Sequence, residues 1–244
     1  HDTGPGGGIG RRARFRSVCR KAWRFESSPG HHPLPARKGE NVAIHLHQGD
    51  LPDGVDLGPV VAIDTETMGL DPRRDRLCLV QLSAGNGQAH LVQIRKGQTS
   101  APNLQRMLAD PNVLKLFHFA RFDIAALYNA FGTLTAPVYC TKIASKLIRT
   151  FTDRHGLKYL VSELVGVDIS KQQQTSDWGA ETLTQAQLDY AASDVLYLHR
   201  LREELDRRLA REDRTELARA CFDFLPTRAI LDLKGWAEPD LFSH

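Results

Sequence analysis

Cysteines are few in this sequence and long apolar runs are absent, and both features narrow the classes of protein to consider. The 244 residues include four cysteines, none in a C-x-x-C pair: Cys19, Cys78, Cys140 and Cys221. Widely spaced cysteines predict reduced thiols in a reducing compartment, so we expect a cytoplasmic protein. No segment approaches the roughly 20 apolar residues that span a bilayer, so we expect no membrane partner.

A strong charge of either sign is also missing outside the first 40 residues. Residues 1–40 hold 9 Lys and Arg against 3 Asp and Glu, whereas residues 41–244 hold 23 against 26. Proteins that hold long duplexes through their phosphates are usually basic, so the acidic body argues against a large nucleic-acid footprint. The composition is otherwise typical of a globular protein with a sizeable core.

Residues 1–40 are rich in glycine, proline, histidine and arginine, and we expect them to form a disordered tail. The chain begins with His1, which indicates a fragment or upstream translated sequence. A basic nucleic-acid-binding arm is the alternative interpretation of this tail. We expect residues 41–244 to form a single domain.

The segment from Val60 to Leu70 begins as a β-branched apolar run and ends with two carboxylates, Asp64 and Glu66. Side chains alternate faces along a strand, so both carboxylates point the same way and Thr65 points the other way. Two like charges at the end of an apolar strand repel each other, and a divalent cation relieves that repulsion. A solvated strand end is the alternative, and this segment alone does not decide between them.

The hydrophobic pattern predicts strands first and helices afterwards, which is typical of an α/β or α+β layered domain. The strand that begins at Val60 is followed by predicted strands at 77–82 and 90–94, and the short connections between the three predict an antiparallel meander. We predict further strands at 42–46 and 113–117, and helices at 103–109, 122–131, 141–148, 157–164, 183–209 (broken) and 216–225.

Two further acidic signals follow. Asp123 lies at or near a helix start after the 113–117 strand, and Tyr190 and Asp194 share one helical face at i and i+4. Each has a structural alternative, because Asp123 suits a helix N-terminus and Tyr190 suits a core.

Three motifs in this order resemble those of the DEDD exonucleases: Asp64-x-Glu66, the later Asp123, and Tyr190-x-x-x-Asp194. The tyrosine four residues before the last aspartate resembles the DEDDy branch, which includes ribonuclease D. The segments 116–123, 140–145 and 170–178 also resemble ribonuclease D. The compact length is most similar to the nanoRNase C group of that family, which degrades very short oligoribonucleotides. The resemblance covers residues 41–244 and implies a ribonuclease H-like fold with a mixed sheet flanked by helices.

The resemblance implies a metal-dependent 3′-5′ exoribonuclease that releases 5′-mononucleotides from short oligoribonucleotides, down to dinucleotides. Two divalent cations, Mg²⁺ or Mn²⁺, would be held by Asp64, Glu66, Asp123 and Asp194. Tyr190 would orient or deprotonate the attacking water. Leu70 would wedge against a base, with a core leucine as the alternative. Candidate substrate contacts are His118 and the basic residues Arg121, Lys142, Arg149, Arg154, His155, Lys158 and Lys171.

Only 50 residues follow Asp194, too few for the added RNA-binding domains of ribonuclease D, which favours short RNA 3′ ends as partners. The apolar segment 225–236 either packs on its own domain or lies in a subunit interface, and the resemblance implies a homo-oligomer. The alternatives are ribonuclease D-type RNA 3′-end processing, a general RNA or DNA exonuclease, a DNA proofreading subunit, and a non-catalytic nucleic-acid-binding module.

Overall fold

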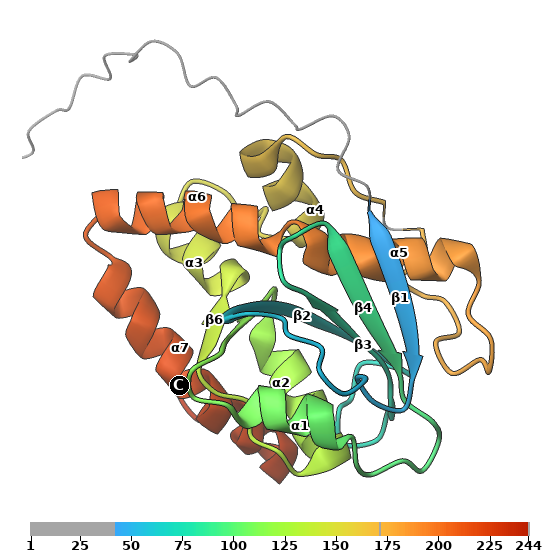
Figure 1. Cartoon of the computed structure of the whole chain (residues 1–244). Helices are drawn as coiled ribbons and strands as arrows, with labels where there is room; N and C mark the ends of the chain where they lie inside the picture. The colour runs from blue at the N-terminus through green and yellow to red at the C-terminus, as the bar shows by residue number, and fades with distance from the viewer. Residues whose placement is uncertain (1–41, 171, 244) are drawn as a thin grey trace, which may run out of the picture. The chain divides into compact units, whose positions relative to one another are not determined.

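The computed structural model describes residues 42–170 and 172–243, which hold one mixed sheet with helices packed against it (Figure 1). Within these residues the strand order is β1-β4-β3-β2-β5-β6. Strands β2, β3 and β4 form the predicted antiparallel meander, and β1, β5 and β6 add to its edges in parallel. The bounds are β1 (Ala43–Gln48), β2 (Val60–Thr67), β3 (Leu77–Ser83), β4 (Gln88–Gln93), β5 (Leu114–Phe117) and β6 (Val138–Cys140).

The helices follow from β4 onward, as the pattern predicts. A helix predicted over 157–164 is present as α4 followed by a wider π turn, and it ends at Gly166, whose φ of 75° suits a glycine cap. The bounds are α1 (Pro102–Ala109), α2 (Ala120–Phe131), α3 (Thr141–Ile148), α4 (Leu157–Leu160), the π turn Val161–Val165, α5 (Gln185–Leu196), α6 (Leu198–Arg211), α7 (Thr215–Leu231) and a terminal turn Asp232–Trp236.

Apolar side chains on both faces of the sheet are buried. Ile63 and Val80 belong to the larger core cluster, together with Ile124 of α2 and Leu104 of α1. The opposite face of β3 and β4 carries Leu79 and Leu91, which form a smaller cluster with Ala191 of α5. Because helices cover both faces, the central strands are apolar on both sides. The polar residues of β2 are therefore confined to its C-terminal end.

The prediction that a helix ends before Pro226 is wrong, because α7 continues to Leu231. Proline removes one backbone donor from a helix. Here Pro226 is buried, and α7 packs against α2 and β6. Packing of this helix therefore outweighs the lost hydrogen bond. The segment 225–236 packs in part on its own domain, while Trp236 remains 47% exposed.

Two other predictions fall on residues that the structure does not describe: the disordered tail at 1–40 and the substrate contact at Lys171. In the described part of the chain, none of the helices combines the length and apolar character needed to cross a bilayer. The fold class is the α/β class that the sequence predicts.

Candidate active site

Three carboxylates from two elements lie together at the C-terminal end of β2. Asp64 and Glu66 of β2 and Asp194 of α5 each offer an oxygen atom, and these atoms all lie within 4.8 Å of one another. Asp64 pairs with Gln81 and Glu66 with Leu79 across the β2–β3 ladder, on the face that α5 covers. The i, i+2 spacing thus places both side chains toward the helix that carries Asp194.

The start of α5 is fixed by a capping box. The backbone N–H of Gln187 donates to the Thr184 hydroxyl, and the backbone N–H of Thr184 donates to Gln187 Oε1 at 2.9 Å. This box satisfies donors at the first turn and sets the register of the helix. Tyr190 and Asp194 then lie one turn apart, and their side chains share a hydrogen bond. The Tyr190 ring packs against Trp178, with ring centroids 6.0 Å apart.

Asp123 reaches the same cavity from α2 but lies outside the three-carboxylate group. Its side chain is 3% exposed, and Asp123 Oδ1 accepts a hydrogen bond from Thr65 Oγ1 at 2.7 Å. Thr65 points away from Asp64 and Glu66, as strand alternation requires. Asp123 thus lines the same cavity as the three clustered carboxylates, close enough for its charge to act on Glu66, although it lies outside the 4.8 Å group.

The crowding of buried carboxylates shifts their protonation. Burial, together with the neighbouring charges of Asp64, Asp194 and Asp123, raises the pKa of Glu66 to about 10. Burial also raises the pKa of Asp64 to about 7 and those of Asp123 and Asp194 well above the ordinary value. The cluster therefore cannot carry its full negative charge unless a cation compensates it.

The donor set fits a hard divalent cation. The clustered groups of Asp64, Glu66 and Asp194 are all carboxylates, and carboxylate oxygens suit Mg²⁺ or Mn²⁺ better than softer metals. Gln81 Nε2 lies 3.5 Å from Asp64 Oδ2, so this amide is a weak donor to the carboxylate. The cluster thus keeps acceptor capacity for a metal ion.

A cavity of about 640 Å³ opens beside the cluster, and four of the predicted substrate contacts line it: Leu70, His118, Lys142 and Lys158. Leu70 is 89% exposed, so the alternative of a core leucine is excluded. Lys142 Nζ lies 4.0 Å from the centroid of the Phe119 ring.

His118 is a neutral imidazole in this structure. Burial, with the nearby charges of Lys142 and His155, lowers the pKa of His118 to about 3. The Thr141 hydroxyl donates its proton to the Phe117 carbonyl, so its oxygen accepts a hydrogen bond from His118 Nδ1 at 2.9 Å. Because the single proton of the neutral ring is then on Nδ1, His118 Nε2 carries no proton and acts as an acceptor. His118 is thus suited to a hydroxyl of a ligand and cannot neutralise a phosphate.

The other basic candidates occupy different positions. Arg121 forms a bidentate ion pair with Asp232 and lines a neighbouring cavity, and His155 bonds to Ser145 Oγ at 2.9 Å and is 9% exposed. Arg149 is buried and donates to the Arg154 carbonyl and to Glu163. Arg154 stacks over Tyr159, whereas Lys158 lines the acidic cavity.

Sequence reasoning missed Phe119, which lines both cavities and adopts a left-handed conformation with φ of 71°. A bulky residue in this region is uncommon and draws attention to a functional position. The sequence signal was available, since Phe119 lies directly between His118 and the start of α2. Trp178, which packs on Tyr190, belongs to the segment 170–178 that resembles ribonuclease D.

The mixed sheet, with acidic residues from β2, α2 and α5 around one cavity, defines a nuclease of the ribonuclease H-like class. Residues 51–210 match the family model described as 3′-5′ exonuclease. This chain belongs to that 3′-5′ exonuclease family.

Curated proteins that are similar in sequence to this chain include ribonuclease D and DNA polymerase I proteins. Ribonuclease D of Acidiphilium cryptum is 39% identical over 158 residues, which cover 65% of this chain and 40% of that protein. DNA polymerase I of Aquifex aeolicus is 36% identical over 143 residues, covering 59% of this chain and 23% of the polymerase. The chain thus spans about two fifths of the length of the curated ribonuclease D proteins that it matches.

Solved structures agree with this grouping. Brucella melitensis NrnC with bound Mg²⁺ is 60% identical, with a TM-score of 0.80, and the match covers 83% of this chain and 99% of NrnC. Escherichia coli RNase D is 29% identical, with a TM-score of 0.63, covering 70% of this chain and 45% of RNase D.

Proposed function

We propose that this protein is a metal-dependent 3′-5′ exoribonuclease that hydrolyses short oligoribonucleotides, down to dinucleotides, to 5′-mononucleotides. The observation that carries the proposal is the cluster of Asp64, Glu66 and Asp194 oxygens within 4.8 Å, with the Tyr190 hydroxyl bonded to Asp194. The 60% identity to NrnC, which has been solved with bound Mg²⁺ and with pGG, supports both the metal and the short substrate.

In the proposed mechanism, Asp64, Glu66, Asp123 and Asp194 would hold two divalent cations, Mg²⁺ or Mn²⁺. When bound, such ions stabilise the negative charge that develops on the attacking and leaving oxygens of a phosphodiester. Asp64 and Glu66 present their oxygens on the face of β2 that α5 covers, and Asp123 lines the same cavity from α2.

Tyr190 orients the attacking water. Burial and the neighbouring charge of Asp194 raise the pKa of the Tyr190 hydroxyl, so it keeps its proton and donates it to Asp194. The lone pairs of the hydroxyl oxygen are then available to accept a hydrogen bond from water. This role does not require Tyr190 to act as a base, and Trp178 behind the ring limits its rotation.

Leu70 contacts a base of the substrate, Lys142 and Lys158 approach its phosphates, and His118 accepts from a sugar hydroxyl. All four residues line the acidic cavity. Its volume of about 640 Å³ lies within the range of small-molecule pockets, which supports a short ligand over a long duplex. Arg121, His155 and Lys171, which the sequence also predicts as substrate contacts, keep a peripheral role in this proposal.

The deciding experiment is a length series of 5′-labelled RNA and DNA, from dinucleotides to 20-mers, with Mg²⁺ or Mn²⁺. Faster turnover of the shortest RNAs is expected, and an Asp194→Asn variant serves as the inactive control. Equal rates on all lengths would favour a general exonuclease, and absence of activity from the wild-type protein would refute the proposal.

A second candidate is ribonuclease D-type processing of RNA 3′ ends, which the 39% identity to Acidiphilium cryptum Ribonuclease D favours. It predicts activity on longer RNA with structured 3′ ends. The same length series separates the two, since processing activity would persist on 20-mers that end beside a hairpin.

The proposal extends to organisation and assembly. Residues 41–244 act as one exonuclease domain, and copies of the chain associate as a homo-oligomer. Exposed apolar side chains near the C-terminal segment support association: Phe224, Trp236, Leu241 and Phe242. Light scattering tests it, and a monomer mass would contradict it.

A further inference from the structure

The loop between β2 and β3 carries Leu70 at the border of two cavities. Leu70 lines both the acidic cavity and a neighbouring cavity of about 500 Å³. Since its side chain is 89% exposed, it has almost no packing of its own. The backbone on either side of Leu70 must therefore determine where this side chain stands.

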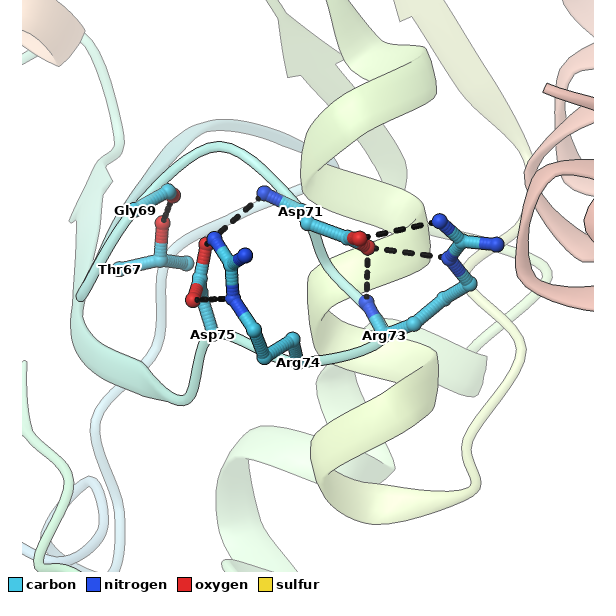
Figure 2. A network of polar contacts seen from close by, with 6 residues as sticks. All are labelled: Thr67, Gly69, Asp71, Arg73, Arg74 and Asp75. Atoms are coloured by element: carbon cyan, nitrogen blue, oxygen red, sulfur yellow. Dashed lines mark hydrogen bonds and ion pairs between the residues drawn. The ribbon is translucent and has the colours of Figure 1, made fainter. Parts of the chain in front are cut away.

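The Asp75 side chain holds the backbone that follows Leu70. Asp75 Oδ2 accepts a hydrogen bond from the backbone N–H of Asp71 at 3.0 Å, directly after Leu70. The guanidinium of Arg74 donates to both Asp75 oxygens, at 2.7 and 2.9 Å. In return, the backbone N–H groups of Arg74 and Asp75 donate to the Asp71 carbonyl at 3.0 and 2.8 Å. Figure 2 shows the Asp75 carboxylate between the chain segments at Gly69 and Asp71.

The residue before Leu70 is shaped to admit this carboxylate. A Cβ at Gly69 would lie 2.3 Å from Asp75 Oδ2, so only glycine leaves room for Asp75 in its present position. The Gly69 carbonyl accepts a hydrogen bond from Thr67 Oγ1, and the Met68 N–H donates to the Arg76 carbonyl at 3.0 Å. Both sides of Leu70 are thus fixed by short contacts.

The Asp75 carboxylate is well suited to this structural task. Its side chain is 11% exposed, whereas its partner Arg74 is 75% exposed. Hydrogen bonding from Arg74, with the backbone N–H of Asp71, lowers the pKa of Asp75 to about 2. An acceptor at this position is therefore present at any pH at which the enzyme would work.

We propose that Asp75 is a positioning residue of the proposed exonuclease: its hydrogen bond to the backbone after Leu70 and its packing against Gly69 fix this leucine at the mouth of the acidic cavity and set the affinity for short substrates. This inference rests on the proposed function and deepens it. Asp75 contacts no substrate, and its whole effect passes through Leu70. A misplacement of about 1 Å in a positioning contact is enough to cost up to 10²-fold in catalysis.

The test is a double-mutant cycle of Asp75→Ala and Leu70→Ala, with steady-state hydrolysis of pGG as the readout. Asp75→Ala should raise KM about 10-fold and change kcat by less than about 2-fold, because the carboxylate cluster is untouched. In the Leu70→Ala background the same substitution should have no further effect, since no leucine remains to be positioned. Asp75→Asn, which keeps an acceptor for the Asp71 N–H, should restore most of the affinity.

Two further variants complete the design. Gly69→Ala displaces the carboxylate without changing it and should reproduce the KM increase of Asp75→Ala. Asp56→Ala is the matched control, because Asp56 accepts a backbone hydrogen bond at 2.8 Å within an exposed loop and lines neither of the two cavities. It should leave both constants unchanged.

The inference is overturned if Asp75→Ala leaves KM unchanged, or if its effect is undiminished in the Leu70→Ala background. Equal loss in Asp75→Asn and Asp75→Ala would also overturn it. These outcomes are separate from failure of the proposed function, which an inactive wild-type protein would reveal before any variant is compared.

Discussion

Asp194→Asn should stabilise the metal-free protein while it removes activity. The substitution keeps the shape of a side chain that is 8% exposed and deletes one of three clustered carboxylates. For two full charges 4.8 Å apart, the repulsion is about 3.5 kcal/mol at an effective dielectric constant of about 20. Shared protons reduce this figure, so we expect a gain of about 1–2 kcal/mol in EDTA, or about 2–8 °C in Tm.

Saturating Mg²⁺ should reverse the order of the two proteins. A ligand at a hundredfold excess over its Kd stabilises the folded state by about 2.7 kcal/mol, which corresponds to about 5–11 °C for a domain of this size. The wild-type protein should show this rise, and Asp194→Asn should show little of it. Turnover of short RNA should fall by about 10²-fold or more, since charge stabilisation at the reacting phosphate is lost.

The assay is thermal unfolding followed by circular dichroism, in EDTA and in Mg²⁺. Asp189→Asn is the matched control, because Asp189 lies on the same helix, is exposed, and accepts a hydrogen bond from Gln185 Nε2 at 2.8 Å. It should behave as wild type in both solutions. Destabilisation of Asp194→Asn in EDTA, or a full Mg²⁺-dependent rise in this variant, would refute the electrostatic reasoning.

Three further predictions concern single side chains. Tyr190→Phe keeps the contact with Trp178 but loses the hydroxyl, so kcat should fall about 10²-fold with KM little changed, and an unchanged kcat in single-turnover assays would exclude the proposed role. Thr65→Val removes the hydrogen bond to Asp123 and should lower stability by about 1–2 kcal/mol in urea denaturation; an unaltered midpoint would contradict it. Burial lowers the pKa of Lys115 from 10.5 to about 8, so between these pH values the unfolded chain binds a proton that the folded protein does not. The free energy of unfolding should therefore rise with pH across this window by up to about 3 kcal/mol relative to Lys115→Met. Parallel pH profiles of the two proteins would refute this prediction.

The sequence was most informative where local periodicity determines side-chain direction. The i, i+2 spacing of Asp64 and Glu66 and the i, i+4 spacing of Tyr190 and Asp194 each predict a shared face, and the structure has both pairs in one cavity. The meander of β2, β3 and β4 was predictable because short turns join consecutive strands.

Contacts between segments that are distant in the sequence could not be predicted from it. Nothing in the local pattern shows that β1 adds to β4 in parallel, or that Thr65, on the far side of β2 from Glu66, holds Asp123. Strand β6 has three residues after Pro137, too few for a periodic signal. Proline at 226 predicts a helix end, and only the packing of α7 on α2 explains why the helix continues.

The order of the acidic residues along the chain has a consequence for biosynthesis. β2 carries Asp64 and Glu66, whereas Asp194 belongs to α5, 130 residues after Asp64. A growing chain folds from its N-terminal side as it emerges at about 5–20 residues per second. The strands of the meander can thus pair several seconds before α5 exists. An incomplete chain that ends before α5 lacks the clustered carboxylates, so the capacity to bind metal there appears only once the sheet and its late helix have met.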